Sequence, residues 1–180
     1  MKVAESLPRR RYDLLDWPAK GSSTVRGFVG PFVLLSVLVA GPSLTVAQES
    51  NIAGPDPSLT PEQVARIQVE ALGRNDEPYP DKGIEITWNF ASLGNKKVTG
   101  PLRRFKRMVH DPVYEPMVNH RGAQYENVRI EGDKAKLDVI LLSKEGRFVG
   151  YQFTLSRQKG GPCDGCWMTD AVARFHVTVH

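Results

Sequence analysis

The sequence predicts an α+β domain in which a curved antiparallel sheet of about four strands packs against two or three helices that precede it. Apolar residues recur at helical spacing between residues 59 and 109, and strand-like alternation begins at residue 121. Helical and strand segments do not alternate along the chain, so βαβ units are not expected. Four alternating segments joined by short polar turns are typical of an antiparallel meander.

The first 47 residues have the pattern of an export signal. An uncharged apolar run at residues 28–39 follows five basic side chains, Arg9, Arg10, Arg11, Lys20 and Arg26. Small residues at Thr45 and Ala47 predict cleavage after Ala47, which gives an extracytoplasmic protein, periplasmic or secreted. The alternative is an uncut membrane anchor at residues 27–47, close to the ~20 residues that a spanning helix needs. A translation start near Val25 would shorten the leader to an ordinary length.

Charge in the remaining chain is nearly balanced. Residues 48–180 contain 18 of the 24 basic and 17 of the 20 acidic residues, so the basic pI belongs largely to the leader. This balance argues against nucleic acid as a partner. Contact with a membrane is expected only through the N-terminal segment, and only if that segment is not cleaved. Residues 48–58 are rich in Gly, Pro, Ser and Asp and predict a flexible linker, and residues 59–180 have the length of one domain.

The first helix has a complete start signal. Thr60 supplies an N-cap hydroxyl, Pro61 takes the first helical position, and Gln63 completes a capping box. The apolar positions that this helix is expected to bury are Val64, Ile67, Ala71 and Leu72. Residues 83–92 are ambiguous, because Ile84, Ile86, Trp88 and Phe90 alternate like a strand, whereas Ile84, Trp88 and Ala91 also share a helical face.

A second clear helix starts near Pro101. Its apolar positions are Leu102, Phe105, Met108 and Val109, and its basic positions are Arg103, Arg104, Lys106 and Arg107. Such a basic cluster is typical of a solvated helix face, which the pattern favours over a site for nucleic acid or anionic lipid. After a short turn at residues 112–117, strands are expected at residues 123–131, 134–143, 148–157 and 167–179.

Several of these segments resemble a family known as domain of unknown function 4864. The shared features are Asn89-Phe90-Ala91-Ser92, Thr99-Gly100-Pro101-Leu102 and Gly165-Cys166-Trp167-Met168-Thr169-Asp170, with isolated matches at Tyr114 and His120. The resemblance covers roughly residues 59–172. It implies an order of helices and strands similar to the cystatin-like and nuclear-transport-factor-2-like folds, and it implies no activity.

Both cysteines of the chain, Cys163 and Cys166, flank the turn dipeptide Asp164-Gly165. The ends of a four-residue turn lie within ~7 Å of each other, so a disulfide is expected in an oxidising compartment. Closing so small a ring should contribute only about 2 kcal/mol of stability. Catalytic thiol–disulfide exchange is the alternative, but it usually requires a helix N-terminus to lower the thiol pKa, and here a strand follows.

The four residues Cys163, Cys166, His176 and His180 have a spacing reminiscent of a zinc site. In a strand, however, His176 and His180 would lie ~13 Å apart, too far to share one ion. We therefore expect no metal and no cofactor. In the same strand register Trp167, Thr169, Ala171, Ala173, Phe175, Val177 and Val179 should face the core, and Asp170, Arg174, His176 and His180 should face outward.

The expected fold can enclose an apolar pocket between its sheet and its helices. Five residues could project acid–base groups into it: His110, Tyr114, His120, Tyr151 and Asp170. Asp170, His120 and Tyr114 are the catalytic candidates, although their spacing forms no recognisable catalytic set. The prediction is a non-catalytic domain that binds a small ligand or a protein partner. The alternative is an enzyme that uses these residues or the thiol pair.

Overall fold

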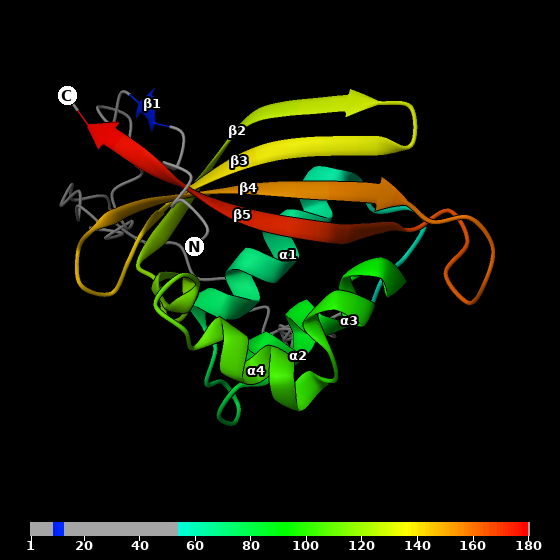
Figure 1. Ribbon diagram of the computed structural model, residues 1–180, viewed down its shortest axis with the longest axis horizontal. Helices are drawn as coiled ribbons and strands as arrows, with labels where there is room; N and C mark the ends of the chain where they lie inside the picture. The colour runs from blue at the N-terminus through cyan, green and yellow to red at the C-terminus, as the bar shows by residue number, and fades with distance from the viewer. Residues whose placement is uncertain (1–8, 13–53, 180) are drawn as a thin grey trace, which may run out of the picture.

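The computed structural model describes residues 9–12 and 54–179, in which four helices precede an antiparallel sheet (Figure 1). The helices are α1 (Pro61–Gly73), α2 (Lys82–Asn89), α3 (Leu93–Thr99) and α4 (Leu102–Val109), and a 3₁₀ turn follows at Glu115–Met117. The antiparallel strands are β2 (Gly122–Glu131), β3 (Lys134–Leu142), β4 (Phe148–Arg157) and β5 (Trp167–Val179). The predicted fold class is confirmed.

The strands are ordered β1-β5-β4-β3-β2 in the sheet, and β1 is the segment Arg9–Tyr12, which pairs in parallel with the end of β5. Apart from this segment, the predicted leader at residues 1–47 lies outside the described residues, as do residues 48–53 of the predicted linker. Within the described part of the chain, none of the helices is long and apolar enough to span a membrane.

Helix α1 begins as the sequence predicts. The Thr60 hydroxyl accepts a hydrogen bond from the Gln63 backbone, and the Gln63 side chain accepts one from the Thr60 N–H, which completes the capping box. Val64 and Leu72 are buried, and Ile67 and Ala71 are partly buried against the same core.

Residues 83–89 of the ambiguous segment lie in α2, so the interpretation of this segment as a strand was wrong. Gly83 lies against α1 so closely that a Cβ there would come within 2.1 Å of the Ala71 carbonyl oxygen. The Asn75 side chain also accepts a hydrogen bond from the Ile84 N–H at 3.1 Å, which satisfies a donor in the first turn of α2. Helix α3, which the sequence did not predict, follows directly, and none of its residues is buried.

Strand β5 contains a β-bulge that reverses the predicted orientation of its second half. Leu155 pairs with Thr169 and Thr154 pairs with Ala171, so Asp170 is an extra residue with no partner on β4. Because directly paired residues share one face of a sheet, Trp167 and Thr169 face the helices together with the buried β4 residues.

Beyond the bulge, Val172 and Arg174 face the helices, because they pair with the core residues Phe153 and Tyr151. The expectation that Ala171, Ala173, Phe175 and Val177 face the core together with Trp167 was therefore wrong, as was the expectation that Arg174 faces outward. Phe175 and Val177 instead pack with Ile140 and Phe148 in a second, smaller apolar cluster.

Candidate functional site

A cavity of about 640 Å³ lies between the helices and the edge of the sheet. Helices α1 to α4 supply most of its wall. The rest comes from β5, from Lys134 of β3 and Phe153 of β4, and from Tyr114 and Met117 at the 3₁₀ turn. Figure 1 shows these helices packed below the sheet. The lining side chains are mostly apolar and include Leu72, Ala91, Val98, Phe105, Met108, Val109, Met117, Phe153 and Val172. The two-layer fold thus forms the kind of pocket that the sequence led us to expect.

Thr169 is the centre of the polar part of the wall. Its hydroxyl accepts a hydrogen bond from the Gln68 side-chain amide at 2.7 Å, and both residues are almost completely buried. Its backbone N–H donates to the Phe90 carbonyl at 2.8 Å, and its carbonyl accepts from the Ser92 N–H at 2.9 Å. The Asn95 side chain donates to the same carbonyl at 3.0 Å. Thr169 therefore connects β5 to α1, to the α2–α3 junction and to α3.

Tyr114 also lines the cavity, as predicted. Its hydroxyl donates a hydrogen bond to the Val172 carbonyl at 3.1 Å, and its ring stacks on Tyr151 with 6.4 Å between centroids. Burial raises the pKa of Tyr114, because the phenolate would lose hydration. Tyr114 thus remains a neutral phenol. Tyr151, another residue expected near the pocket, donates its hydroxyl hydrogen to the Val113 carbonyl at 2.7 Å. It therefore holds the loop that contains Val113.

Asp170, the bulge residue, contributes to the cavity wall next to Lys134. Its carboxylate lies 3.4 Å from the Lys134 ammonium, and its side chain is 29% exposed. The prediction that Asp170 faces outward holds only in part, because the bulge brings it both to the cavity and to solvent. Val98 of α3 lines the cavity and is 76% exposed, so the mouth opens beside α3.

His120 and His110 do not line this cavity. The His120 ring packs against Gly73, and its Nε2 lies 2.9 Å from the Val69 carbonyl of α1. Burial lowers the pKa of His120, since the imidazolium would be poorly hydrated there. His110 lies 2.8 Å from the Asp81 carboxylate on the surface. Of the three catalytic candidates, the structure brings Tyr114 and Asp170 to one cavity and leaves His120 outside it.

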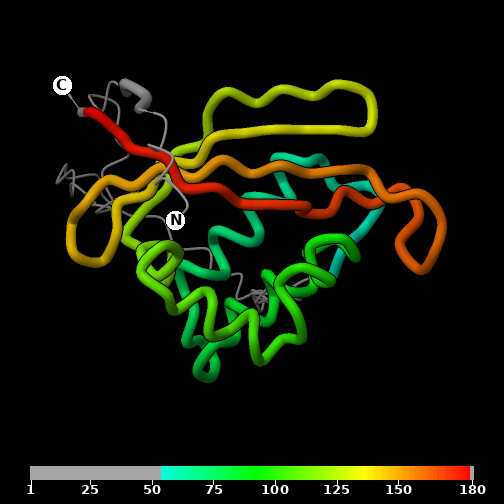
Figure 2. Tube along the Cα trace, in the orientation of Figure 1, coloured from blue at the N-terminus to red at the C-terminus, as the bar shows by residue number. Residues whose placement is uncertain are grey.

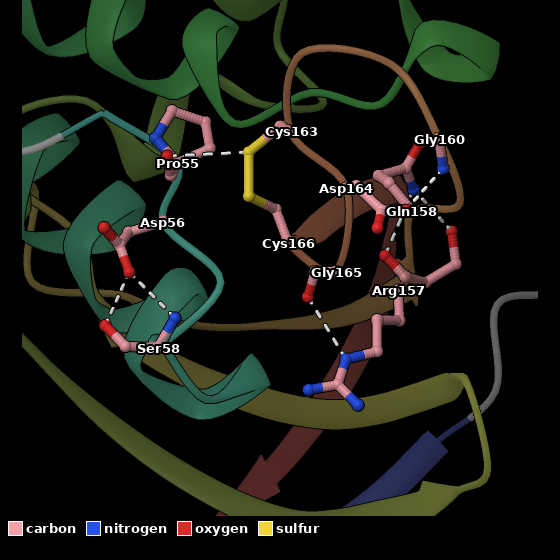
Figure 3. Close-up of a disulfide and its surroundings, with 11 residues drawn as sticks. Pro55, Asp56, Ser58, Arg157, Gln158, Gly160, Cys163, Asp164, Gly165 and Cys166 are labelled. Atoms are coloured by element: carbon pink, nitrogen blue, oxygen red, sulfur yellow. Dashed lines mark hydrogen bonds between the residues drawn. A yellow bond between two sulfur atoms is a disulfide. The ribbon is translucent and has the colours of Figure 1, made fainter.

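Cys163 and Cys166 form a disulfide in the β4–β5 loop, which extends beyond the end of the sheet (Figures 2 and 3). Their Cα atoms are 5.4 Å apart, consistent with the predicted tight turn. Cys166 is completely buried, and Cys163 lies against the Pro55 carbonyl in the segment that leads into α1. The bond therefore closes a loop that packs on the start of the domain.

The rest of the zinc-like pattern does not form a site among the described residues. His176 is exposed on β5, and His180 lies outside the described part of the chain. Within residues 9–12 and 54–179, no group of three or more His, Cys, Asp or Glu side chains could hold a metal ion.

Sequence reasoning missed Gln68, Asn95 and Thr169 as residues that shape the cavity. Gln68 did carry a signal, because it lies one turn from both Val64 and Leu72 on the apolar face of α1, where a polar side chain needs a buried partner. Its partner, 101 residues away, could not be identified from spacing alone.

No protein-family model, curated protein or solved structure matched the chain. The α+β architecture thus rests on the structure itself. The resemblance to domain of unknown function 4864 stays a prediction.

Proposed function

We propose that this domain binds a small, largely apolar ligand in the cavity without converting it chemically. The observation that carries this proposal is the cavity itself. Its volume of about 640 Å³ lies in the range of small-molecule sites, and its apolar wall contains a few fixed polar groups, as such sites commonly do.

The bonding of those polar groups favours binding over catalysis. The Thr169 hydroxyl accepts from Gln68, and the Tyr114 hydroxyl donates to the Val172 carbonyl, so both hold the fold together. A general base must reach a substrate proton within hydrogen-bond distance, and the carboxylate in the wall, Asp170, lies beside the Lys134 ammonium. Thiol exchange is disfavoured because Cys166 is buried and is followed by a strand.

We further infer that the chain is an exported member of the domain of unknown function 4864 family, with a cystatin-like or nuclear-transport-factor-2-like arrangement. The order of helices before strands supports this inference, as do the cavity between the two layers and the disulfide, which suits an oxidising compartment.

Filling the cavity tests the proposed binding. Gly94 lines the cavity, and a Cβ there would meet only the Ser92 hydroxyl oxygen at an ordinary 3.7 Å, so Gly94→Phe can extend into the space. Gly54→Phe is the matched control, because Gly54 has open space around it outside the cavity. Binding of 1-anilinonaphthalene-8-sulfonate and of a dansyl-labelled fatty acid is measured by fluorescence.

We expect Gly94→Phe to weaken probe binding by at least about tenfold and Gly54→Phe to leave it unchanged. Equal binding by both variants would refute the proposal. Asp170→Asn separates the two function classes, because an aspartate that only borders the mouth can lose its charge without loss of probe binding. Native mass spectrometry of protein isolated from its own compartment then identifies the bound ligand, and a product of turnover found there would favour the enzyme alternative.

A further inference from the structure

Positive charge is concentrated on α3 and α4. Six of the 18 basic residues in residues 48–180, and none of the 17 acidic ones, lie between residues 93 and 109. This segment therefore has a formal charge of +6, whereas the remainder of residues 48–180 has a charge of −5. The near-neutral total conceals a strongly polarised domain.

Two of the six basic side chains have partners within the domain. The Lys106 ammonium lies 3.0 Å from the Glu85 carboxylate and 3.8 Å from that of Asp81. The Lys96 ammonium lies 5.4 Å from the centroid of the Trp88 ring.

The other four, Lys97, Arg103, Arg104 and Arg107, are exposed and form no ion pair with the residues that the structure describes. The three arginines line one surface hollow together with Pro101. Their charges are thus available to an external anion.

Apolar side chains project from the same pair of helices. Leu93 and Val98 of α3 are 70% and 76% exposed, more than any other large hydrophobic residue in the described part of the chain. Val98 also lines the cavity, so the mouth opens next to these side chains. Figure 1 shows α3 and α4 on the side of the molecule away from the β2–β3 hairpin.

We propose that these six residues, Leu93, Lys97, Val98, Arg103, Arg104 and Arg107, form a face that docks on an anionic lipid bilayer. Here this set is called the α3–α4 face. Basic side chains gain free energy near an anionic lipid surface, and exposed apolar side chains gain it by entering the interface. A nucleic acid or another polyanion would attract the arginines but would leave Leu93 and Val98 in water. The pairing of both kinds of side chain favours the bilayer.

Docking in this orientation brings the cavity mouth to the lipid surface. The cavity then takes up a single amphiphile directly from the bilayer, a role that rests on the ligand binding proposed above. The docking itself does not depend on the cavity, so the two can fail independently.

The test measures co-sedimentation of the protein with vesicles of phosphatidylcholine alone and of phosphatidylcholine with about 30% phosphatidylglycerol. The charge variant is Arg103→Gln/Arg104→Gln/Arg107→Gln, and its matched control removes three exposed arginines elsewhere, Arg74→Gln/Arg121→Gln/Arg129→Gln. The apolar variant is Leu93→Ser/Val98→Ser, with Ile130→Ser, at a residue that is 55% exposed on β2, as its control.

We expect binding to the anionic vesicles only. The charge variant should bind about a hundredfold more weakly, at roughly fivefold for each arginine, while its control loses far less. The apolar variant should bind more weakly than Ile130→Ser. Gly94→Phe should still bind vesicles while failing to take up the dansyl-labelled fatty acid.

Three results would overturn the inference. The first is equal vesicle binding by the charge variant and its control, and the second is vesicle binding that the apolar variant leaves intact. The third is tight binding to heparin that exceeds vesicle binding and does not depend on Leu93 and Val98, since the face would then be a polyanion site. If Gly94→Phe loses uptake of the dansyl-labelled fatty acid but still binds vesicles, then ligand binding in the cavity and docking by the α3–α4 face are independent.

Discussion

The buried hydrogen bond between Gln68 and Thr169 should stabilise the wall of the cavity measurably. Thr169→Val keeps the shape of the side chain but removes the hydroxyl that accepts from the Gln68 amide at 2.7 Å. The amide keeps its bond to the Val64 carbonyl, so one of its two N–H groups loses its acceptor at a residue that is 1% exposed. Leaving a buried donor unpaired costs about 1–3 kcal/mol, and we expect a loss of that size.

A double-mutant cycle separates the bond from the two side chains. Gln68→Leu alone removes the donor, whereas Gln68→Leu/Thr169→Val replaces both partners with apolar groups, which can be nearly neutral. The double variant should therefore be more stable than the sum of the two single losses predicts, with a coupling of about 1–2 kcal/mol.

The free energy of unfolding is measured by urea titration with tryptophan fluorescence. Trp167 is a suitable reporter, because it is 6% exposed and lies two residues from Thr169 on β5. Thr154→Val, the same exchange at a partly exposed position on β4, should change stability by less than about 0.5 kcal/mol. If Thr169→Val is equally harmless, or if the single losses add within about 0.5 kcal/mol, the bond contributes nothing and the reasoning fails.

Three further outcomes follow from the bulge, the histidine and the disulfide. Deletion of Asp170 should destabilise the domain far more than Asp170→Ala, because loss of the bulge residue turns one half of β5 to the wrong face. Asp170→Ala removes only the partly exposed ion pair with Lys134, which contributes about 1 kcal/mol or less. Similar melting temperatures for the two variants would contradict this prediction. His120 has a pKa below its unfolded value of about 6.5, so stability is complete above that pH and falls as the pH drops toward the folded pKa. In His120→Gln the urea midpoint should depend less on pH between pH 8 and 5 than in the unmodified protein. The same dependence of the midpoint on pH in both proteins would count against the prediction. Reduction of the disulfide should lower the free energy of unfolding by about 2 kcal/mol. The variant Cys163→Ala/Cys166→Ala has no disulfide, so the reductant should leave its free energy of unfolding unchanged. A reductant effect on that variant would show that the loss has another cause.

Local signals in the sequence were enough to predict several elements. The capping box at Thr60 defines the start of α1, and the turn at Asp164-Gly165 brings Cys163 and Cys166 into disulfide range, because both depend only on residues a few positions apart. The segment at residues 83–92 was undecidable locally, since its apolar residues fit both periods. In the helical conformation that this segment adopts, Gly83 packs closely against α1, a contact between residues distant from the local pattern.

By itself, the sequence determined the fold class, the order of helices before strands and the presence of Tyr114 and Asp170 among the candidates for a pocket. Tertiary structure alone decided which residues meet there. An extra residue in β5 leaves the alternation before and after it intact, so no pattern count reveals that Asp170 is a bulge and that Val172, not Ala171, faces the helices. The partnership of Gln68 with Thr169 likewise spans 101 positions and depends on the packing of α1 against β5. Long-range pairing of this kind is set by the complementary surfaces of two folded layers, which single-sequence periodicity does not encode.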